Sequence, residues 1–219
     1  MYAAPVESCL STREYVTTYN YLLQNKNFKL RPDQLAKVAN EVSKNCTGAA
    51  KNFIQIVDIL TKAEVASADA IKAGLKFSSS ETEVVDAFRK IFKMSFKRKY
   101  LNLDLASSLK IATKLSVDFK GLQKSALNDF SKMVKFCVKK ENLDLPRPQC
   151  AKFATDVALL GQSFEAEISK TFLSSYNFLT SKKGPNLTTF KALELSKTIS
   201  SYGPYSSENF IQGYKFGVS

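Results

Sequence analysis

The chain has 219 residues and a formal net charge of +12, with 32 Lys and Arg against 20 Asp and Glu. It contains no histidine, which excludes a Ser-His-Asp or Cys-His catalytic site, an HExxH zinc site and a His₃ metal centre. Its apolar content of 44% and charged content of 24% are ordinary for a globular protein with a sizeable core.

Apolar residues recur at helical spacing along the chain, and no stretch alternates convincingly with the period of a β-strand. In the segment 81–98, for example, Val84, Phe88 and Ile91 share one face. The sequence therefore predicts an all-α protein. The expected helices, in chain order, cover residues 8–25, 32–45, 48–62, 66–77, 81–98, 105–116, 119–140, 148–160, 164–181, 188–200 and 206–217.

Two independent markers indicate an internal repeat of about 39 residues. Similar short segments align the lysines Lys37, Lys72, Lys110, Lys152 and Lys191. The tetrapeptide that begins at Asn52, Asn-Phe-Ile-Gln, also recurs at Asn209, which is close to four periods later. Each repeat is predicted to hold a shorter A helix followed by a longer B helix, and the helix 8–25 precedes the first A helix.

Two-helix units of this length resemble the HEAT-like α-solenoid, an architecture of stacked helical hairpins. The resemblance covers nearly the whole chain and concerns the architecture, without pointing to a specific family. It implies about five tandem hairpin repeats of ~39 residues plus one extra N-terminal helix. We expect these repeats to form a single domain, residues 1–219.

The four cysteines can pair in three ways, and the predicted hairpins select one of them. In an antiparallel helix pair, residues at equal distance from the loop lie side by side. Cys9 with Cys46, and Cys137 with Cys150, are each centred on a predicted hairpin loop. We therefore predict two disulfides, one in each hairpin. The alternative is four buried free cysteines, since free Cys packs well as a small apolar residue.

Disulfides would place the protein in an oxidising compartment, either the periplasm or the extracellular space. The first residues, 1–5, have neither a basic nor an apolar leader. We therefore expect a mature terminus from which a leader has been removed. No apolar run approaches the roughly 20 residues that a membrane helix needs, so a transmembrane protein is not expected.

Basic residues gather at the predicted ends of the B helices. Those expected to contact a partner are Lys62, Lys97, Arg98, Lys99, Lys139, Lys140, Lys182 and Lys183. Successive B helices of a solenoid run parallel, so their ends would share one edge and attract an acidic protein, an anionic polymer or an anionic membrane. The alternative is that these cations only complement the helix macrodipoles.

Candidate catalytic groups are confined to two glutamate pairs with a spacing of two residues. They are Glu81 with Glu83 and Glu165 with Glu167. Residues spaced by two do not face each other on a helix, so first-turn charges explain them better. Asp104 and Asp144 are interpreted as equivalent turn or cap residues before A helices. We expect no enzyme activity, no cofactor and no metal site, since CxxC, glycine-rich phosphate loops and GxSxG are all missing.

These observations predict a secreted or periplasmic helical-repeat protein that binds a macromolecular partner, as a scaffold, adaptor or inhibitor. A nucleic-acid partner is not expected, because the RNP, GxxG and zinc-finger motifs are missing. The second hypothesis is a helical carrier of an apolar ligand such as a lipid. Its cavity would be lined by Phe88, Phe92, Phe96, Phe130, Phe136, Phe172 and Phe178.

Overall fold

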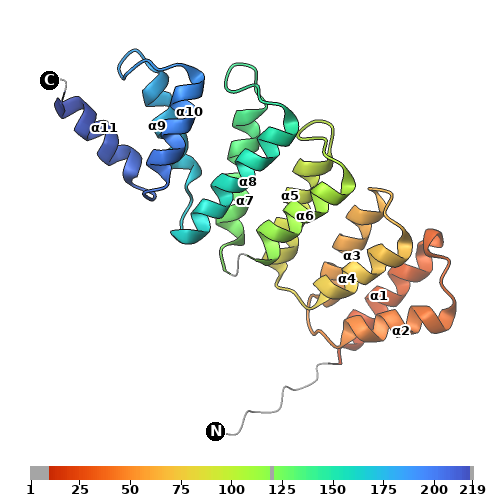
Figure 1. Ribbon diagram of the computed structural model, residues 1–219. Coiled ribbons are helices and arrows are strands. Elements are labelled where there is room, and N and C mark those ends of the chain that lie inside the picture. The colour runs from red at the N-terminus through yellow and green to blue at the C-terminus, as the bar shows by residue number, and fades with distance from the viewer. Residues whose placement is uncertain (1–9, 119–120, 218–219) are drawn as a thin grey trace, which may run out of the picture. The chain divides into compact units, whose positions relative to one another are not determined.

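The computed structural model describes residues 10–118 and 121–217 (Figure 1). These residues form eleven α-helices, one short 3₁₀ turn and no β-strand, which confirms the all-α prediction. The chain forms two compact units, Met1–Arg89 and Lys90–Ser219, and each is described by itself. The boundary between them falls inside helix α5.

All eleven predicted helices are present, and their ends differ from the predicted ones by no more than five residues. The helices are α1 Thr12–Gln24, α2 Pro32–Ser43, α3 Ala49–Thr61, α4 Ser67–Ser78, α5 Thr82–Phe96, α6 Leu105–Val117, α7 Gln123–Cys137, α8 Arg147–Ser163, α9 Ser169–Thr180, α10 Thr189–Ser200 and α11 Ser206–Gly217. The 3₁₀ turn η1, Lys26–Phe28, lies in the loop after α1.

The first unit contains the hairpins α1–α2 and α3–α4, whose helices pack together more extensively than any other pair in this unit. Helix α1 also lies beside α3, and α2 beside α4. The hydroxyl of Ser11 accepts a hydrogen bond from the Glu14 N–H, 3.4 Å away, and so caps the start of α1.

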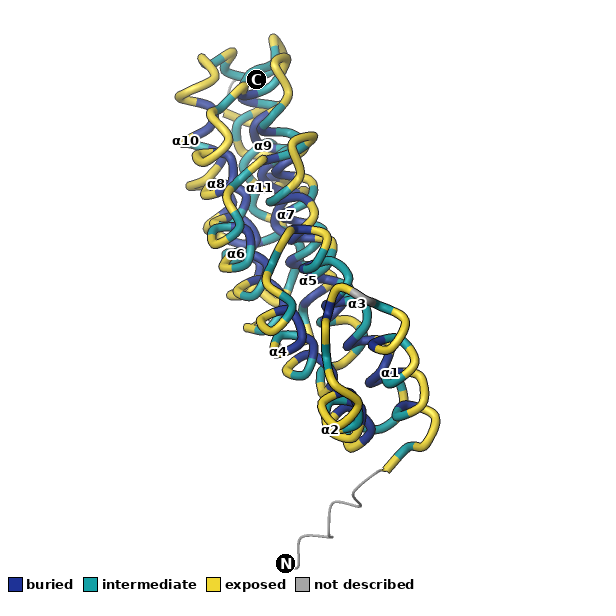
Figure 2. Tube along the Cα trace, turned by 90° about the vertical axis from the view of Figure 1, so that its right-hand side faces the viewer, coloured by how far each residue is buried: buried dark blue, intermediate teal, exposed yellow. Residues whose placement is uncertain are grey.

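The second unit contains the hairpins α7–α8 and α9–α10, and α6 contacts both α7 and α8. Figure 2 shows two layers in this unit, with α7, α9 and α11 in one and α6, α8 and α10 in the other. The closest packing joins a B helix to the A helix that follows it along the chain. Among the described residues, α11 is therefore a B helix with no A helix after it.

The A helices share a stripe of small residues four positions apart, which are buried against the neighbouring helices. The stripe consists of Ala39 and Ser43; Ala70, Gly74 and Ser78; Ser108, Ala112 and Ser116; Cys150, Ala154 and Ala158; and Ala192, Ser196 and Ser200. The approach is closest at Gly74, where an added Cβ atom would lie 2.6 Å from Cγ2 of Val57 and 2.8 Å from Cδ2 of Phe53. Small side chains therefore allow the two layers to pack closely.

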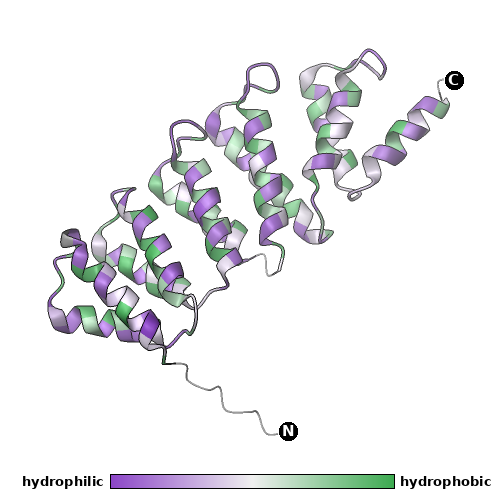
Figure 3. Ribbon diagram, turned by 180° about the vertical axis from the view of Figure 1, so that it is seen from behind, coloured by the Kyte–Doolittle hydropathy of each residue, from purple (hydrophilic) through white to green (hydrophobic). Residues whose placement is uncertain are grey.

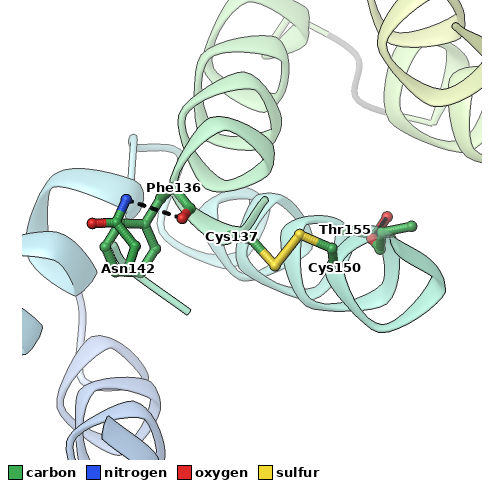
Figure 4. Close-up of a disulfide and its surroundings, with 6 residues drawn as sticks. Phe136, Cys137, Asn142, Cys150 and Thr155 are labelled. Atoms are coloured by element: carbon green, nitrogen blue, oxygen red, sulfur yellow. Dashed lines mark hydrogen bonds between the residues drawn. A yellow bond between two sulfur atoms is a disulfide. The ribbon is translucent and has the colours of Figure 1, made fainter. Parts of the chain in front are cut away.

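A disulfide joins Cys137, the last residue of α7, to Cys150 in the first turn of α8 (Figure 4). The two Cα atoms are 5.7 Å apart, and both residues are fully buried. This confirms one of the two predicted bridges. Cys9 lies outside the described residues and Cys46 is half-buried, so the Cys9–Cys46 pairing stays a prediction.

Candidate functional site

The five loops that connect a B helix to the next A helix each contain one residue other than glycine in the left-handed region. These residues are Lys29, Glu64, Asn102, Asp144 and Asn186, with φ values of 48°, 61°, 49°, 46° and 52°. Their spacings of 35, 38, 42 and 42 residues give the repeat directly from the backbone. Each hairpin loop therefore contains a left-handed residue, although the loop sequences differ.

In the second unit, the residue after the left-handed one ties each loop back to the preceding helix. The N–H of Leu103 donates to the carbonyl of Ser95 at 2.9 Å, and that of Leu187 donates to the carbonyl of Leu179 at 2.8 Å. The N–H of Leu145 bonds the carbonyl of Cys137 at 3.4 Å. These bonds fix the loop backbones relative to the helices.

The loop geometry corrects the expected equivalence of Asp104 and Asp144. Asp144 is left-handed and corresponds to Asn102, because both precede the residue that bonds back to the helix. Asp104 instead caps α6, and its Oδ1 accepts a hydrogen bond from the Ser107 N–H at 2.8 Å. The shared Leu-Asp-Leu sequence thus occupies two different places in the hairpin.

All eight basic residues predicted to contact a partner are exposed. Lys62 is the C-cap of α3 in the first unit. The other seven lie in the α5–α6, α7–α8 and α9–α10 loops of the second unit, after the helices end at Phe96, Cys137 and Thr180. In Figure 1 these three loops lie on the same side of this unit, and Figure 3 colours them mainly as hydrophilic.

Arg147, the first residue of α8, contacts one of these loops. Its Nη1 donates to the carbonyl oxygens of Arg98 and Tyr100, at 2.6 and 2.8 Å, so the start of α8 lies against the α5–α6 loop. Within the described residues of the three loops, Lys139 and Glu141 form one ion pair, 3.7 Å apart and largely exposed. The other six basic side chains pair with no described carboxylate within 4 Å. Counting Asp104, Glu141 and Asp144, the α5–α6 and α9–α10 loops each carry a net positive charge, whereas the α7–α8 loop is neutral overall.

Complementing the helix dipole explains only some of these cations. Lys97 directly follows the last residue of α5, where the partial negative charge of the helix end acts on it. Lys140 and Lys183 lie three residues beyond their helices, and the dipole effect falls off within the last turn. The helix dipole therefore does not account for Lys140 and Lys183.

The glutamates of the pair Glu165 and Glu167 lie in different surroundings. Glu165 is exposed with a left-handed φ of 50°. Glu167 accepts hydrogen bonds from Asn128 Nδ2 at 2.6 Å and from Lys132 Nζ at 2.8 Å. The bond from Lys132 is the main cause that lowers the pKa of Glu167. Glu167 thus joins α7 to the loop before α9.

Two buried carboxylates that the sequence did not reveal have a structural role. Glu14 of α1 accepts hydrogen bonds from the N–H groups of Gly48 at 3.2 Å and Ala50 at 2.6 Å, at the start of α3. Asp129 of α7 does the same at the start of α9. Both satisfy N–H groups that have no partner inside the helix they begin. One sequence feature could have revealed Asp129: it is an acidic residue within an apolar helical stripe, next to Phe130.

The phenylalanines proposed to line a cavity pack against other aromatic rings. Phe88 lies 4.7 Å from Phe77, measured between ring centroids, and is 1% exposed. Phe136 contacts Phe172 edge-on at 6.3 Å, and Phe172 is fully buried. These contacts explain the rings as core residues. The carrier hypothesis stays a prediction.

Within the described ranges, no group of three Cys, Asp or Glu residues could hold a metal ion. None of the described helices is both long and apolar enough to span a bilayer. In comparisons with known proteins, no family model matches the chain, and neither curated proteins nor solved structures give a significant match.

Proposed function

We propose that the protein is a non-enzymatic α-solenoid of HEAT-like hairpins, in a single domain, that binds an anionic macromolecule outside the cytoplasm. The binding surface consists of the α5–α6, α7–α8 and α9–α10 loops, with Lys97, Arg98, Lys99, Lys139, Lys140, Lys182 and Lys183. The observation that carries the proposal is that three loops of one conformation hold exposed cations on the same side of the second unit.

Fixed loops suit this role because they order the cations before the partner arrives. The backbone bonds of Leu103, Leu145 and Leu187 and the contact from Arg147 reduce the conformational entropy lost on binding. A row of like charges also raises the association rate of an oppositely charged partner, and salt screens this attraction.

The disulfide supports the proposed compartment. The Cys137–Cys150 bridge persists in an oxidising environment, whereas cytosolic thiols are normally kept reduced. The non-enzymatic assignment is supported by the sequence, which has no histidine, and by Glu14 and Asp129, whose carboxylates cap helices.

Heparin chromatography tests the proposed surface with two variants of equal net charge. The loop variant combines Lys97→Glu, Arg98→Glu, Lys139→Glu and Lys182→Glu. The control variant reverses four exposed lysines outside these loops, Lys51, Lys76, Lys152 and Lys170. We expect the loop variant to elute at a much lower salt concentration than the control. Equal elution of the two variants would show that only net charge matters.

A further inference from the structure

A groove of about 300 Å³ lies between α6 and α8 in the second unit. Its apolar lining includes Leu103 and Ile111, which are half-buried. Three exposed lysines also line the groove, and these are Lys110, Lys114 and Lys152. The groove therefore combines an apolar surface with positive charge from both helices.

The lysines of the groove have no anionic partner in the described part of the chain. None of them forms an ion pair with a described carboxylate within 4 Å. Asp156 is the acidic residue of the lining, and it is exposed and likewise outside these ion pairs. Three cations against one anion leave the lining with a net positive charge, which is complementary to an acidic ligand.

A lysine recurs at one position of the A helices. Eight residues after the left-handed residue of the preceding loop, four of these helices carry the exposed lysines Lys37, Lys72, Lys110 and Lys152. In α10 the corresponding residue is Glu194, and not Lys191 as the sequence alignment suggested. Lys110 and Lys152 therefore occupy corresponding positions of α6 and α8, one from each wall of the groove.

We propose that the α6–α8 groove binds an acidic segment of a partner protein in which one large apolar side chain lies between carboxylates. The apolar side chain contacts Leu103 and Ile111, and the flanking carboxylates pair with Lys110 and Lys152. The apolar contact contributes most of the affinity, because burying a side chain is favourable whereas exposed ion pairs contribute little. These lysines are distinct from those of the basic loops, so the inference does not depend on the proposed function.

A protein segment matches the groove better than a polysaccharide or a lipid does. A sulfated polysaccharide is complementary to the lysines, but it has no apolar group to cover Leu103 and Ile111. A lipid tail is complementary to the apolar lining, but a space of about 300 Å³ is at the lower limit of ligand pockets, and the exposed lining would leave part of the tail in water. One apolar side chain between carboxylates matches both parts of the lining.

Neither another repeat nor a second copy of the chain is the expected occupant. Repeats of a solenoid stack end to end, and α6 and α8 already contact each other within one stack. A further repeat would therefore pack at the end of the stack and not over this groove. A second copy would bring the same net charge of +12 to a basic groove, and like charges repel.

The probe is the synthetic peptide Ser-Asp-Glu-Leu-Glu-Asp-Ser, and its control has serine in place of leucine at equal charge. Titrated into the full ¹⁵N-labelled chain, the leucine peptide should shift the amide signals of Leu103, Ile111 and Ala151. It should bind at least about tenfold more tightly than the serine peptide, because the leucine side chain is buried. No shifts in α6–α8, or equal binding of both peptides, would overturn the proposal. Displacement of the peptide by laurate would assign the groove to a lipid and contradict it.

Two protein variants of equal net charge provide the second arm. Lys110→Glu should weaken binding of the leucine peptide by about fivefold or more. Lys135→Glu, at an exposed position of α7 outside the lining, should change it by less than about twofold. Equal weakening by both variants would show that only net charge acts, which would contradict the proposal.

Two further measurements separate this inference from the other possibilities. The heparin control variant contains Lys152→Glu, so it should bind the leucine peptide more weakly than the loop variant of the same net charge does. The groove and the basic loops are thus tested independently. Sedimentation equilibrium of the protein alone should show that Lys110→Glu leaves its molecular mass per particle unchanged. A dimer that dissociates in Lys110→Glu would assign the groove to a second copy and overturn the proposal.

Discussion

The carboxylate of Asp129, fully buried in α7, accepts a hydrogen bond from the backbone N–H of Ser169, 2.9 Å from Oδ1. Its other oxygen accepts a bond from the N–H of Ile168 at 3.0 Å. Helix N-termini combine unpaired N–H groups with a partial positive charge. One carboxylate accepts hydrogen bonds from those N–H groups and also interacts favourably with the charge. Asp129 therefore joins two B helices that are neighbours in space and about one repeat apart in sequence.

Replacing Asp129 with alanine should lower the free energy of unfolding by about 2–4 kcal/mol, because two buried N–H groups lose their acceptor. Asp129→Asn should lower it less, since the amide oxygen keeps one of the bonds. Urea denaturation measures both losses. The control is Asp156→Ala at an exposed position of α8, where a change within about 0.5 kcal/mol is expected. Equal stability of Asp129→Ala and the wild type would contradict the capping role.

The pH dependence of this contribution has a definite sign. Burial raises the pKa of Asp129 in the folded state above its unfolded value of about 3.9. The folded state then holds the proton more tightly, so this contribution to stability is largest below pH 3.9 and falls as pH rises through the folded pKa. The free energy of unfolding of the wild type minus that of Asp129→Asn should therefore become smaller as pH rises from about 3.9 through the folded pKa. Urea titrations of both proteins at several pH values measure this difference. A gap that stays constant with pH would refute the assignment.

Replacing a glycine with alanine should change the stability in opposite directions at Gly74, which contacts Phe53 and Val57, and at Gly213. An added Cβ at Gly74 meets Val57 at 2.6 Å, so Gly74→Ala should destabilise the protein by about 1–3 kcal/mol despite its better helix propensity. At Gly213 of α11 an added Cβ meets nothing within 4 Å. Gly213→Ala should therefore stabilise the protein, by up to about 1 kcal/mol. Thermal unfolding of both variants distinguishes the signs.

The helices were predictable because each has an apolar stripe and ends near residues that break helices. The largest errors occurred where a backbone conformation overrode the pattern. Helix α7 begins at Gln123 and not at 119, since Gly121 has a left-handed φ of 75°. Helix α9 begins at Ser169 and not at 164, since Glu165 is left-handed. Apolar periodicity alone does not report such residues.

The sequence located the cations at the hairpin ends, but it placed most of them inside helices that in fact stop earlier. It could not reveal Glu14 and Asp129 as caps, because their N–H partners lie one repeat away and depend on how the B helices pack. The pairing of Cys137 with Cys150 was predictable because it needed only the centre of one hairpin. Local relationships were thus accessible from sequence, and contacts between repeats were not.

The Cys137–Cys150 bridge closes a short loop, with a sequence separation of 13 residues. Its removal in the double variant Cys137→Ala/Cys150→Ala should cost about 3 kcal/mol in the chain-entropy description. A reductant should lower the free energy of unfolding of the wild type to that of this variant. It should leave the variant unchanged, unless a second bridge is also reduced. Combining each protein with Cys46→Ala removes that effect. Peptide mapping without reductant tests Cys9–Cys46, and a Cys9–Cys150 link would contradict both pairings.

Arg147 lies at the start of α8, where a cation is unfavourable for the helix dipole, and its side chain bonds the carbonyls of Arg98 and Tyr100. Because the residue is exposed, Arg147→Ala should change the global stability by less than about 1 kcal/mol. The α5–α6 loop should nevertheless exchange its amide hydrogens faster, since its backbone loses two bonds. Hydrogen-exchange mass spectrometry would compare residues 97–104 with residues 181–188, a loop of the same conformation that lacks this contact. Equal acceleration in both loops would show that Arg147 acts on the whole unit and does not hold this loop.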